Sequence, residues 1–413
     1  MQLKIDKNLT ITFFTVAIPI LMQFIYIRYI SYNVEKEIYG NFVLLQTIIV
    51  ALSYIFIQIP SQAYDRFYNT TKNKIEFVNE FRTILIIVNI LSLVVIVLYG
   101  YIVDKYSMLI LFLIFIYFVL LNNYSFNQKV FLLNLERKKY FYLKILESAA
   151  KFITPLLAYY YYPSLESFII GLVIGYLISF IILLTYMKDY KFKIVLNIEN
   201  QKKYFKFAYP ILFVSIFSWG ISFVDRYFIE YYLNTEKVAI YAILAQVAGI
   251  GQIIGQIYFM YVNPKILKMF EENQNSTLAY LSKMLKWLGL IFILLTLVSF
   301  FIPIQIYEIL LEPKIIRDNY YFYTFIILLI SIFATVYQTA FSMYLNLFKK
   351  LNILSYIYLI AFIVNVIGNF FIKDYGIIAA GISTLVAYIV ILLLQILYVS
   401  KYIKMENLGF KIG

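Results

Sequence analysis

The sequence contains no cysteine and no histidine among its 413 residues. The missing cysteines exclude disulfides and thiolate chemistry, and the missing histidines exclude Ser-His-Asp catalysis and zinc sites of the usual kind. Charged residues make up only 14% of the chain, against roughly 25% in soluble domains, while hydrophobic residues make up 63%. These proportions exclude a soluble enzyme. We expect an integral membrane protein that has no metal ion or cofactor.

Apolar runs of about 20 residues, the length that spans a bilayer core as a helix, recur along the whole chain. None shows the alternation of an outer-membrane barrel strand. The first run is too long for the core of a signal peptide, and no small-residue cleavage site follows it, so we expect it to remain as a helix. The twelve predicted spans are residues 9–30, 39–59, 82–103, 107–127, 141–161, 166–187, 207–231, 238–262, 284–305, 319–346, 352–372 and 375–399.

Lys and Arg residues are distributed unequally between the connecting segments. If both termini are cytoplasmic, 26 of the 35 Lys and Arg residues fall in cytoplasmic segments and eight in outer segments or outer helix ends. This is a positive-inside pattern, so the net charge of +13 reports orientation next to anionic lipid and not nucleic-acid binding. We expect a multi-pass protein of the cytoplasmic (inner) membrane with both termini in the cytoplasm.

The connecting segments are short, and none exceeds about 20 residues if each span has the length that a bilayer requires. There is no Gly-rich phosphate loop and no room for a nucleotide-binding domain, which excludes an ATP-driven pump on this chain alone. The function must therefore lie in the helices themselves.

Short matches in the same order indicate that helices one to six and seven to twelve are two copies of one unit. Residues 133–138 resemble residues 345–350, Ile38-Tyr39 resembles Ile240-Tyr241, and Arg28 corresponds to Arg226. Six helices are an even number, so the two copies share one orientation. We predict an all-α fold of two six-helix bundles, residues 1–187 and 207–413, joined by a cytoplasmic linker, residues 188–206. A pseudo-twofold axis along the membrane normal would relate the bundles, with the substrate path between them.

Arginine at matching depth in both copies is the first candidate for function. Arg28 and Arg226, the latter beside Asp225, would either anchor helix ends at the interface or bind an anion, because the planar guanidinium suits phosphate. Arg66 follows Pro60, and there a plain positive-inside role is favoured.

Glu147 and Lys151 are further candidates because charges inside a membrane segment are costly. They stand four residues apart on one helical face. Either they neutralise each other, or Lys151 faces a cavity with Glu147 as a protonatable neighbour that would bind a coupling ion.

Amide side chains and spaced glycines complete the polar residues of the spans. Gln252 and Gln256, and likewise Asn365 and Asn369, are four residues apart. Interhelical hydrogen bonding is favoured for them, with sugar binding second. The pairs Gly171 and Gly175, and Gly251 and Gly255, favour close helix packing over ligand binding.

Residues 207–212 (Phe-Ala-Tyr-Pro-Ile-Leu), Trp219, residues 225–229 (Asp-Arg-Tyr-Phe-Ile) and Ile240-Tyr241 resemble the seventh helix and following loop of the polysaccharide flippases. These belong to the multidrug/oligosaccharidyl-lipid/polysaccharide superfamily. The resemblance implies a cargo of undecaprenyl-pyrophosphate-linked oligosaccharide, moved from the inner to the outer leaflet by alternating access for O-antigen or capsule synthesis. It also implies a cationic cavity to which Arg28 and Arg226 contribute, coupling to H⁺ or Na⁺, and a polysaccharide polymerase as partner.

Three alternatives remain open from the sequence. A drug or cation extruder of the same superfamily would require carboxylates deep in a bundle, and Glu147 is the only candidate for such a carboxylate. A membrane-embedded polymerase or glycosyltransferase would require a large outer loop, whereas the outer loops predicted here are short. A scaffold subunit that depends on a partner is the third.

Overall fold

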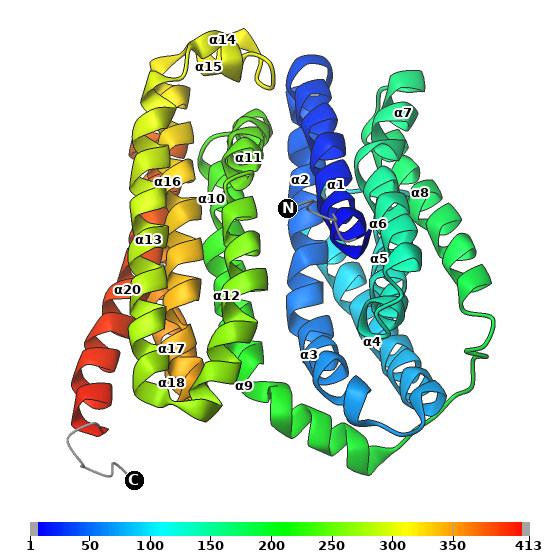
Figure 1. The fold of residues 1–413 in the computed structure, drawn as a ribbon. Coiled ribbons are helices and arrows are strands. Elements are labelled where there is room, and N and C mark those ends of the chain that lie inside the picture. The colour runs from blue at the N-terminus through cyan, green and yellow to red at the C-terminus, as the bar shows by residue number, and fades with distance from the viewer. Residues whose placement is uncertain (1–6, 349, 407–413) are drawn as a thin grey trace. The chain divides into compact units, whose positions relative to one another are not determined.

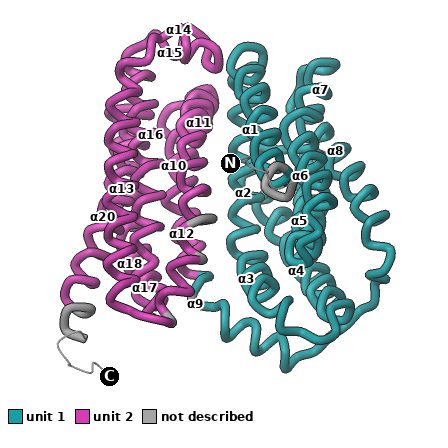
Figure 2. The backbone as a smooth tube through the Cα atoms, in the orientation of Figure 1, with its two compact units in different colours: residues 1–212 teal, residues 213–413 magenta. Residues whose placement is uncertain are grey.

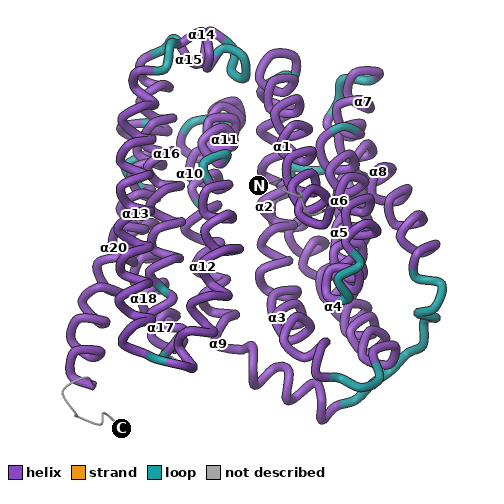
Figure 3. Tube along the Cα trace, in the orientation of Figure 1, coloured by secondary structure: helices purple, strands orange, loops and turns teal. Residues whose placement is uncertain are grey.

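The computed structural model describes residues 7–348 and 350–406, and the described part of the chain is helical with no strand (Figure 3). The chain divides into two compact units, residues 1–212 and 213–413, and the division falls inside one helix, α9 (Figure 2). The extreme termini, and with them the predicted cytoplasmic Lys4 and Lys411, lie outside the described residues.

Unit 1 consists of long apolar helices joined by short turns (Figure 1). Its elements are α1 (Lys7–Asn33), α2 (Lys36–Leu52), the π-helical η1 (Ser53–Ile57), α3 (Gln58–Phe67), the 3₁₀ turn η2 (Tyr68–Thr70), α4 (Lys74–Val103), α5 (Met108–Leu133), α6 (Arg137–Phe152), α7 (Thr154–Tyr161), α8 (Leu165–Tyr186) and the first part of α9 (Ile198–Phe223).

Unit 2 continues from α9 and adds two short helices, α14 and α15, at one end of its bundle (Figure 1). Its further elements are α10 (Asp225–Tyr232), α11 (Thr235–Gly249), α12 (Gln252–Glu272), α13 (Gln274–Phe301), α14 (Ile304–Tyr307), α15 (Pro313–Ile316), α16 (Asn319–Phe341), α17 (Met343–Leu347), α18 (Leu351–Asn369), α19 (Ile372–Tyr375) and α20 (Ile377–Glu406).

Ten helices or continuous helical stretches of the described residues are long and apolar enough to cross a membrane. An eleventh span is the pair α11 and α12, which bends by 40° around Ile250 and Gly251. The predicted helix over 141–161 is broken at Ile153 into α6 and α7. Pro155 explains the break, because it has no amide proton and its ring clashes with the carbonyl four residues earlier.

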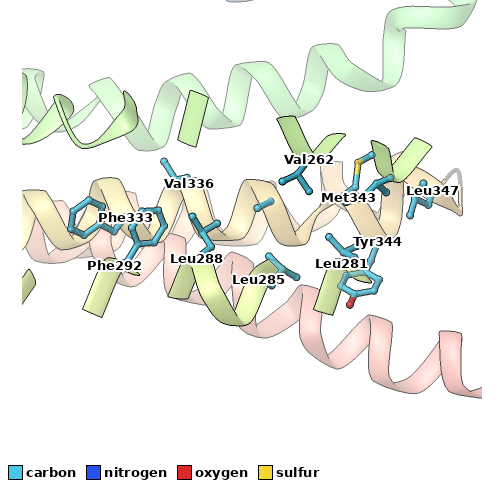
Figure 4. Close-up of a cluster of buried hydrophobic side chains, with 12 residues drawn as sticks. Val262, Leu281, Leu285, Leu288, Phe292, Phe333, Val336, Met343, Tyr344 and Leu347 are labelled. Carbon is cyan, nitrogen blue, oxygen red and sulfur yellow. The ribbon is translucent and has the colours of Figure 1, made fainter. Parts of the chain in front are cut away.

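Apolar side chains hold each unit together. In unit 2, Phe292 of α13 stacks on Phe333 of α16 with ring centroids 4.6 Å apart, and Leu285, Leu288 and Val336 extend the same core (Figure 4). In unit 1, Tyr64 of α3 packs against Phe81 and Phe126.

Glycine permits the close approach of α8 to α6 and α7. A Cβ on Gly171 would lie 2.6 Å from the Thr154 carbonyl oxygen, and one on Gly175 would lie 2.8 Å from the Ala150 Cα. The prediction that this glycine pair marks close helix packing is confirmed. Gly251 and Gly255 likewise face Phe333 and Val336 of α16.

Candidate functional site

A buried ion pair lies where α9 gives way to α10. Asp225, the first residue of α10, is 1% exposed. Its Oδ1 accepts a hydrogen bond from Arg226 Nη1 at 3.0 Å, and its Oδ2 accepts one from the Tyr241 hydroxyl of α11 at 2.6 Å. Both carboxylate oxygens are therefore satisfied, as a buried charge requires.

Arg226 is held from several sides. Its Nη1 also donates to the Ser222 carbonyl at 2.6 Å. The guanidinium carbon lies 4.7 Å from the centre of the Phe223 ring and 5.8 Å from that of Tyr241, within the range of cation–π attraction. An anion that binds Arg226 must therefore compete with Asp225 for it.

Amide and hydroxyl side chains of α18 and α20 extend this site within unit 2. Asn369 Nδ2 donates to Asn365 Oδ1 at 3.2 Å, and Asn365 Nδ2 lies 3.4 Å from both Ser383 Oγ and Thr384 Oγ1. Ser383 Oγ of α20 also donates to Asn369 Oδ1 at 2.5 Å, so the prediction of interhelical hydrogen bonding by Asn365 and Asn369 is confirmed.

The two groups lie within unit 2, where Tyr241 of α11 and Thr384 of α20 are both buried. The result is one buried cluster, which we call the Asp225 cluster: Asp225, Arg226, Tyr241, Asn365, Asn369, Ser383 and Thr384. It gathers a carboxylate and several neutral oxygens, which are the ligands that hard cations prefer. Asp225, Arg226 and the two asparagines are predictable from the sequence, which marks Tyr241 only as part of the repeat and gives no signal for Ser383 or Thr384, whose types are common in membrane helices.

Glu147 of α6 belongs to a second polar group, in unit 1. Its Oε2 accepts hydrogen bonds from Lys144 Nζ at 2.7 Å and from Gln128 Nε2 of α5 at 2.8 Å. The structure thus pairs Glu147 with Lys144. The spacing of four residues had raised a pairing with Lys151, which the structure does not form. Lys151 is exposed, and its Nζ lies 5.0 Å from the centre of the Phe152 ring.

The other predicted site residues lie on the surfaces of their own units. Arg28 of α1 is exposed, with its guanidinium carbon 4.9 Å from the centre of the Tyr32 ring. Arg66 of α3 is exposed in unit 1, and so are Gln252 and Gln256 of α12 in unit 2. Arg28 belongs to unit 1 and Arg226 to unit 2, and their burial differs although their predicted depth is equal.

One buried cation is not predictable from the sequence. Arg82 of α4 is one of the 26 Lys and Arg residues of the predicted cytoplasmic segments, yet it is buried. Its Nε donates to Asn127 Oδ1 of α5 at 2.7 Å, and its Nη1 donates to the Tyr190 carbonyl at 2.7 Å. No sequence signal distinguishes Arg82 from its exposed neighbours, because its partners come from distant parts of the chain.

Acidic residues do not form a metal centre: across the described residues, no group of three or more could hold a metal ion.

A family model described as "Polysaccharide biosynthesis protein" matches residues 5–270. A search of the curated proteins finds no match.

Solved structures show the same fold. The chain is similar to the lipid II flippase MurJ in an inward closed conformation, with a TM-score of 0.63, 16% identity and coverage of 95% of this chain and 87% of that one. It is similar to an inward-facing multidrug resistance MATE family transporter of the MOP superfamily (TM-score 0.69, 11% identity, coverage 96% and 98%). It is also similar to the Vibrio cholerae MATE transporter VcmN in the bent form (TM-score 0.54, 14% identity, coverage 98% and 99%). These likenesses confirm the predicted fold class, an all-α membrane protein of the twelve-helix type.

Proposed function

Because the chain belongs to the polysaccharide biosynthesis protein family, a flippase family of the multidrug/oligosaccharidyl-lipid/polysaccharide superfamily, we propose that it carries lipid-linked oligosaccharide across the membrane. It is a multi-pass membrane transporter and not an enzyme, which sets aside the polymerase alternative. The cargo is an undecaprenyl-pyrophosphate-linked repeat unit, moved from the inner to the outer leaflet for O-antigen or capsule synthesis.

The observation that carries this proposal is the position and fixed orientation of the Arg226 guanidinium. A pyrophosphate cannot enter a bilayer without a fixed cation to pair with, and arginine binds phosphate oxygens in pairs. Arg226 is a fixed cation at a helix break, oriented by Ser222 and by the two aromatic rings. Its partner Asp225 holds the guanidinium through a contact of 3.0 Å between Arg226 Nη1 and Asp225 Oδ1.

The Asp225 cluster supplies a means of coupling. A proton or sodium ion that binds Asp225 neutralises the carboxylate and weakens its hold on Arg226. The guanidinium is then available to the pyrophosphate, and loss of the ion returns it to Asp225. Coupling thus consists of two cations competing for one carboxylate. Glu147 is the second coupling candidate, with Lys144 in the place of the arginine.

The exposed candidates are assigned to the path of the cargo. Arg28, Lys151 and Arg66 would contact phosphate or sugar hydroxyls in unit 1, and Gln252 and Gln256 would do so in unit 2. Their exposure supports this role, because a side chain must be accessible to touch a passing ligand.

The charge distribution of the connecting segments supports a finer localisation. We place the protein in the cytoplasmic membrane with both termini inside. A polysaccharide polymerase that consumes the exported repeat units is the expected partner.

The experiment is deletion of this gene followed by analysis of lipid-linked intermediates on each membrane face. Accumulation of complete repeat units on the cytoplasmic face supports the proposal and identifies the cargo. Single, unpolymerised units on the outer face contradict it. Normal intermediates together with new drug sensitivity favour instead a cation-coupled extruder of the same fold.

A further inference from the structure

Residues 188–209, which we call the linker surface, contact α4, and backbone groups of residues 190, 191 and 195 make hydrogen bonds to it. Asn79 Nδ2 donates to the Lys191 carbonyl at 2.9 Å, and Arg82 Nη1 donates to the Tyr190 carbonyl at 2.7 Å. The Val195 amide donates to Thr83 Oγ1 at 3.0 Å. Figure 1 shows this segment passing the N-terminal end of α4 on its way from α8 to α9. One side of the segment is therefore fixed to α4.

The other side of the segment is apolar and exposed. Val195 is half-buried, whereas Ile194 is 70% and Leu196 62% exposed. Phe192 and Ile198 are exposed as well, so every second residue from 192 to 198 presents a large apolar side chain. An apolar row of this length facing water is unfavourable, which indicates that it has a partner.

The apolar surface continues onto the first turns of α9. Tyr204 faces α4, where its hydroxyl donates to Glu80 Oε2 at 3.2 Å and its ring lies 5.0 Å from that of Phe81. Phe205 and Tyr209 are exposed, and their rings lie 6.4 Å apart in a stacked arrangement. This part of α9 has one face against α4 and one apolar face without a protein contact from α4, as in helices that lie in a membrane interface.

Charge and position identify the occupant. Residues 188–206 carry six lysines and two acidic residues, a net charge of +4. The segment begins two residues after α8, a helix long and apolar enough to cross a membrane, on which Ile181 and Leu184 are exposed. The apolar row is thus continuous with a lipid-facing helix and is surrounded by cations, a combination that fits anionic headgroups over acyl chains.

We propose that the linker surface docks on the anionic lipid surface of the membrane, with Arg82 as its anchor on α4. Phe192, Ile194, Leu196 and Ile198 enter the acyl boundary, and the lysines contact the headgroups. This role is independent of the cargo, and it holds the connection between the two units at a defined depth.

The absence of cysteine allows a direct test on the full-length protein. Ile194→Cys and Leu196→Cys are each labelled with a nitroxide and reconstituted into vesicles of phosphatidylcholine, with or without one quarter phosphatidylglycerol. Gln274→Cys, at an exposed polar position at the start of α13, is the matched control. Power saturation by oxygen and by a water-soluble nickel complex then reports the depth of each label.

In anionic vesicles we expect the labels at 194 and 196 to be at least fivefold less accessible to nickel than the label at 274. Raised salt or omission of phosphatidylglycerol should bring them towards the control value. Nickel access equal to the control in anionic vesicles overturns the proposal. Equal immersion in neutral and anionic vesicles also overturns it, as does dipolar broadening that shows a second copy on this surface.

Two further variants separate the charges from the anchor. Lys191→Gln with Lys193→Gln should abolish the difference between the two vesicle compositions without changing the elution profile of the protein. Arg82→Gln should increase the mobility of a label at 194. Because the depth measurement uses an unaltered Arg82, the proposal stays testable even if that variant does not fold.

Discussion

Asp225 and Arg226 differ from most charged residues of the chain in being buried with a partner. Their side chains are 2% and 11% exposed, respectively. A buried pair costs more to break than an exposed one, because the remaining charge has no water to return to. Substitutions here must therefore separate lost function from lost stability.

Arg226→Lys keeps the cation beside Asp225 and removes the planar fork. We expect membrane levels within twofold of the wild type, and transport about tenfold to a hundredfold slower, because a charged hydrogen bond contributes about 1.5–3 kcal/mol. Transport of labelled lipid-linked oligosaccharide into the outer leaflet of vesicles measures this. Equal rates would assign Arg226 to anchoring alone. Arg226→Ala is the less informative variant, since removing one partner of a buried pair costs about 3–5 kcal/mol.

Asp225→Asn mimics the neutral carboxyl that ion binding would create. We expect transport that continues without responding to an imposed proton or sodium gradient, because the competition for Arg226 is removed. Glu147→Gln is the matched control in unit 1. If Glu147→Gln alone removes the gradient response, the coupling site lies at Glu147 and not at Asp225.

Helix packing in this protein depends on where glycines and prolines interrupt the helices. Pro155 divides α6 from α7, and Gly171 and Gly175 then allow α8 to pack closely against both of them. Gly171 faces backbone atoms that cannot rotate away, so the close approach is a property of three elements together.

Gly171→Ala should destabilise the protein by about 1–3 kcal/mol, because the added methyl group overpacks the contact with Thr154. A lowered melting temperature in detergent measures this. Gly249→Ala is the matched control: it is also helical, and a Cβ there would meet nothing within 4 Å. Equal melting temperatures for the two variants would show that α8 can shift to accept the methyl group.

The short helices α14 and α15 follow α13 and are linked by an exposed ion pair. Arg317 Nε donates to Glu308 Oε1 at 2.5 Å, and this hydrogen bond lowers the pKa of Glu308. A carboxyl whose pKa is lower in the folded state stabilises the fold above its unfolded pKa. That contribution is lost as the pH falls through the folded value.

The protection of residues 304–318 against hydrogen exchange, measured relative to the intrinsic exchange rate at each pH, should therefore fall as the pH drops below the ordinary glutamate range. Glu308→Gln should exchange faster at neutral pH and lose this acid dependence. A wild-type protein whose exchange in this segment shows no acid step would remove the role assigned to the pair.

The positive-inside pattern of the connecting segments predicts an orientation of the molecule that can be tested along one helix. The exposed residues Gln274 and Lys314 lie at the start of α13 and beyond its end, respectively. We expect Lys314→Cys to react with a membrane-impermeant maleimide in intact cells, and Gln274→Cys to react only after permeabilisation. The chain has no cysteine of its own, so no background label arises. The reverse pattern would invert the orientation.

The sequence by itself determined the class of protein and much of the helix pattern. Apolar runs such as residues 82–103 and 166–187 must cross the bilayer as helices, because no other structure satisfies their backbone there. Composition also excluded catalysis by histidine or cysteine, because that chemistry requires side chains that the sequence does not contain. The interhelical role of Asn365 and Asn369 was also predictable, because carboxamides one turn apart in a membrane helix need partners.

Only the tertiary structure decided which charges are buried and what they contact. Glu147 has two basic residues within one turn, and the sequence does not reveal that Gln128 of another helix favours the pairing with Lys144. Arg82 resembles any cytoplasmic arginine until Asn127 and the Tyr190 carbonyl meet it. Periodicity follows from local geometry along one helix, whereas pairing depends on which helices become neighbours, and packing of the whole chain sets that.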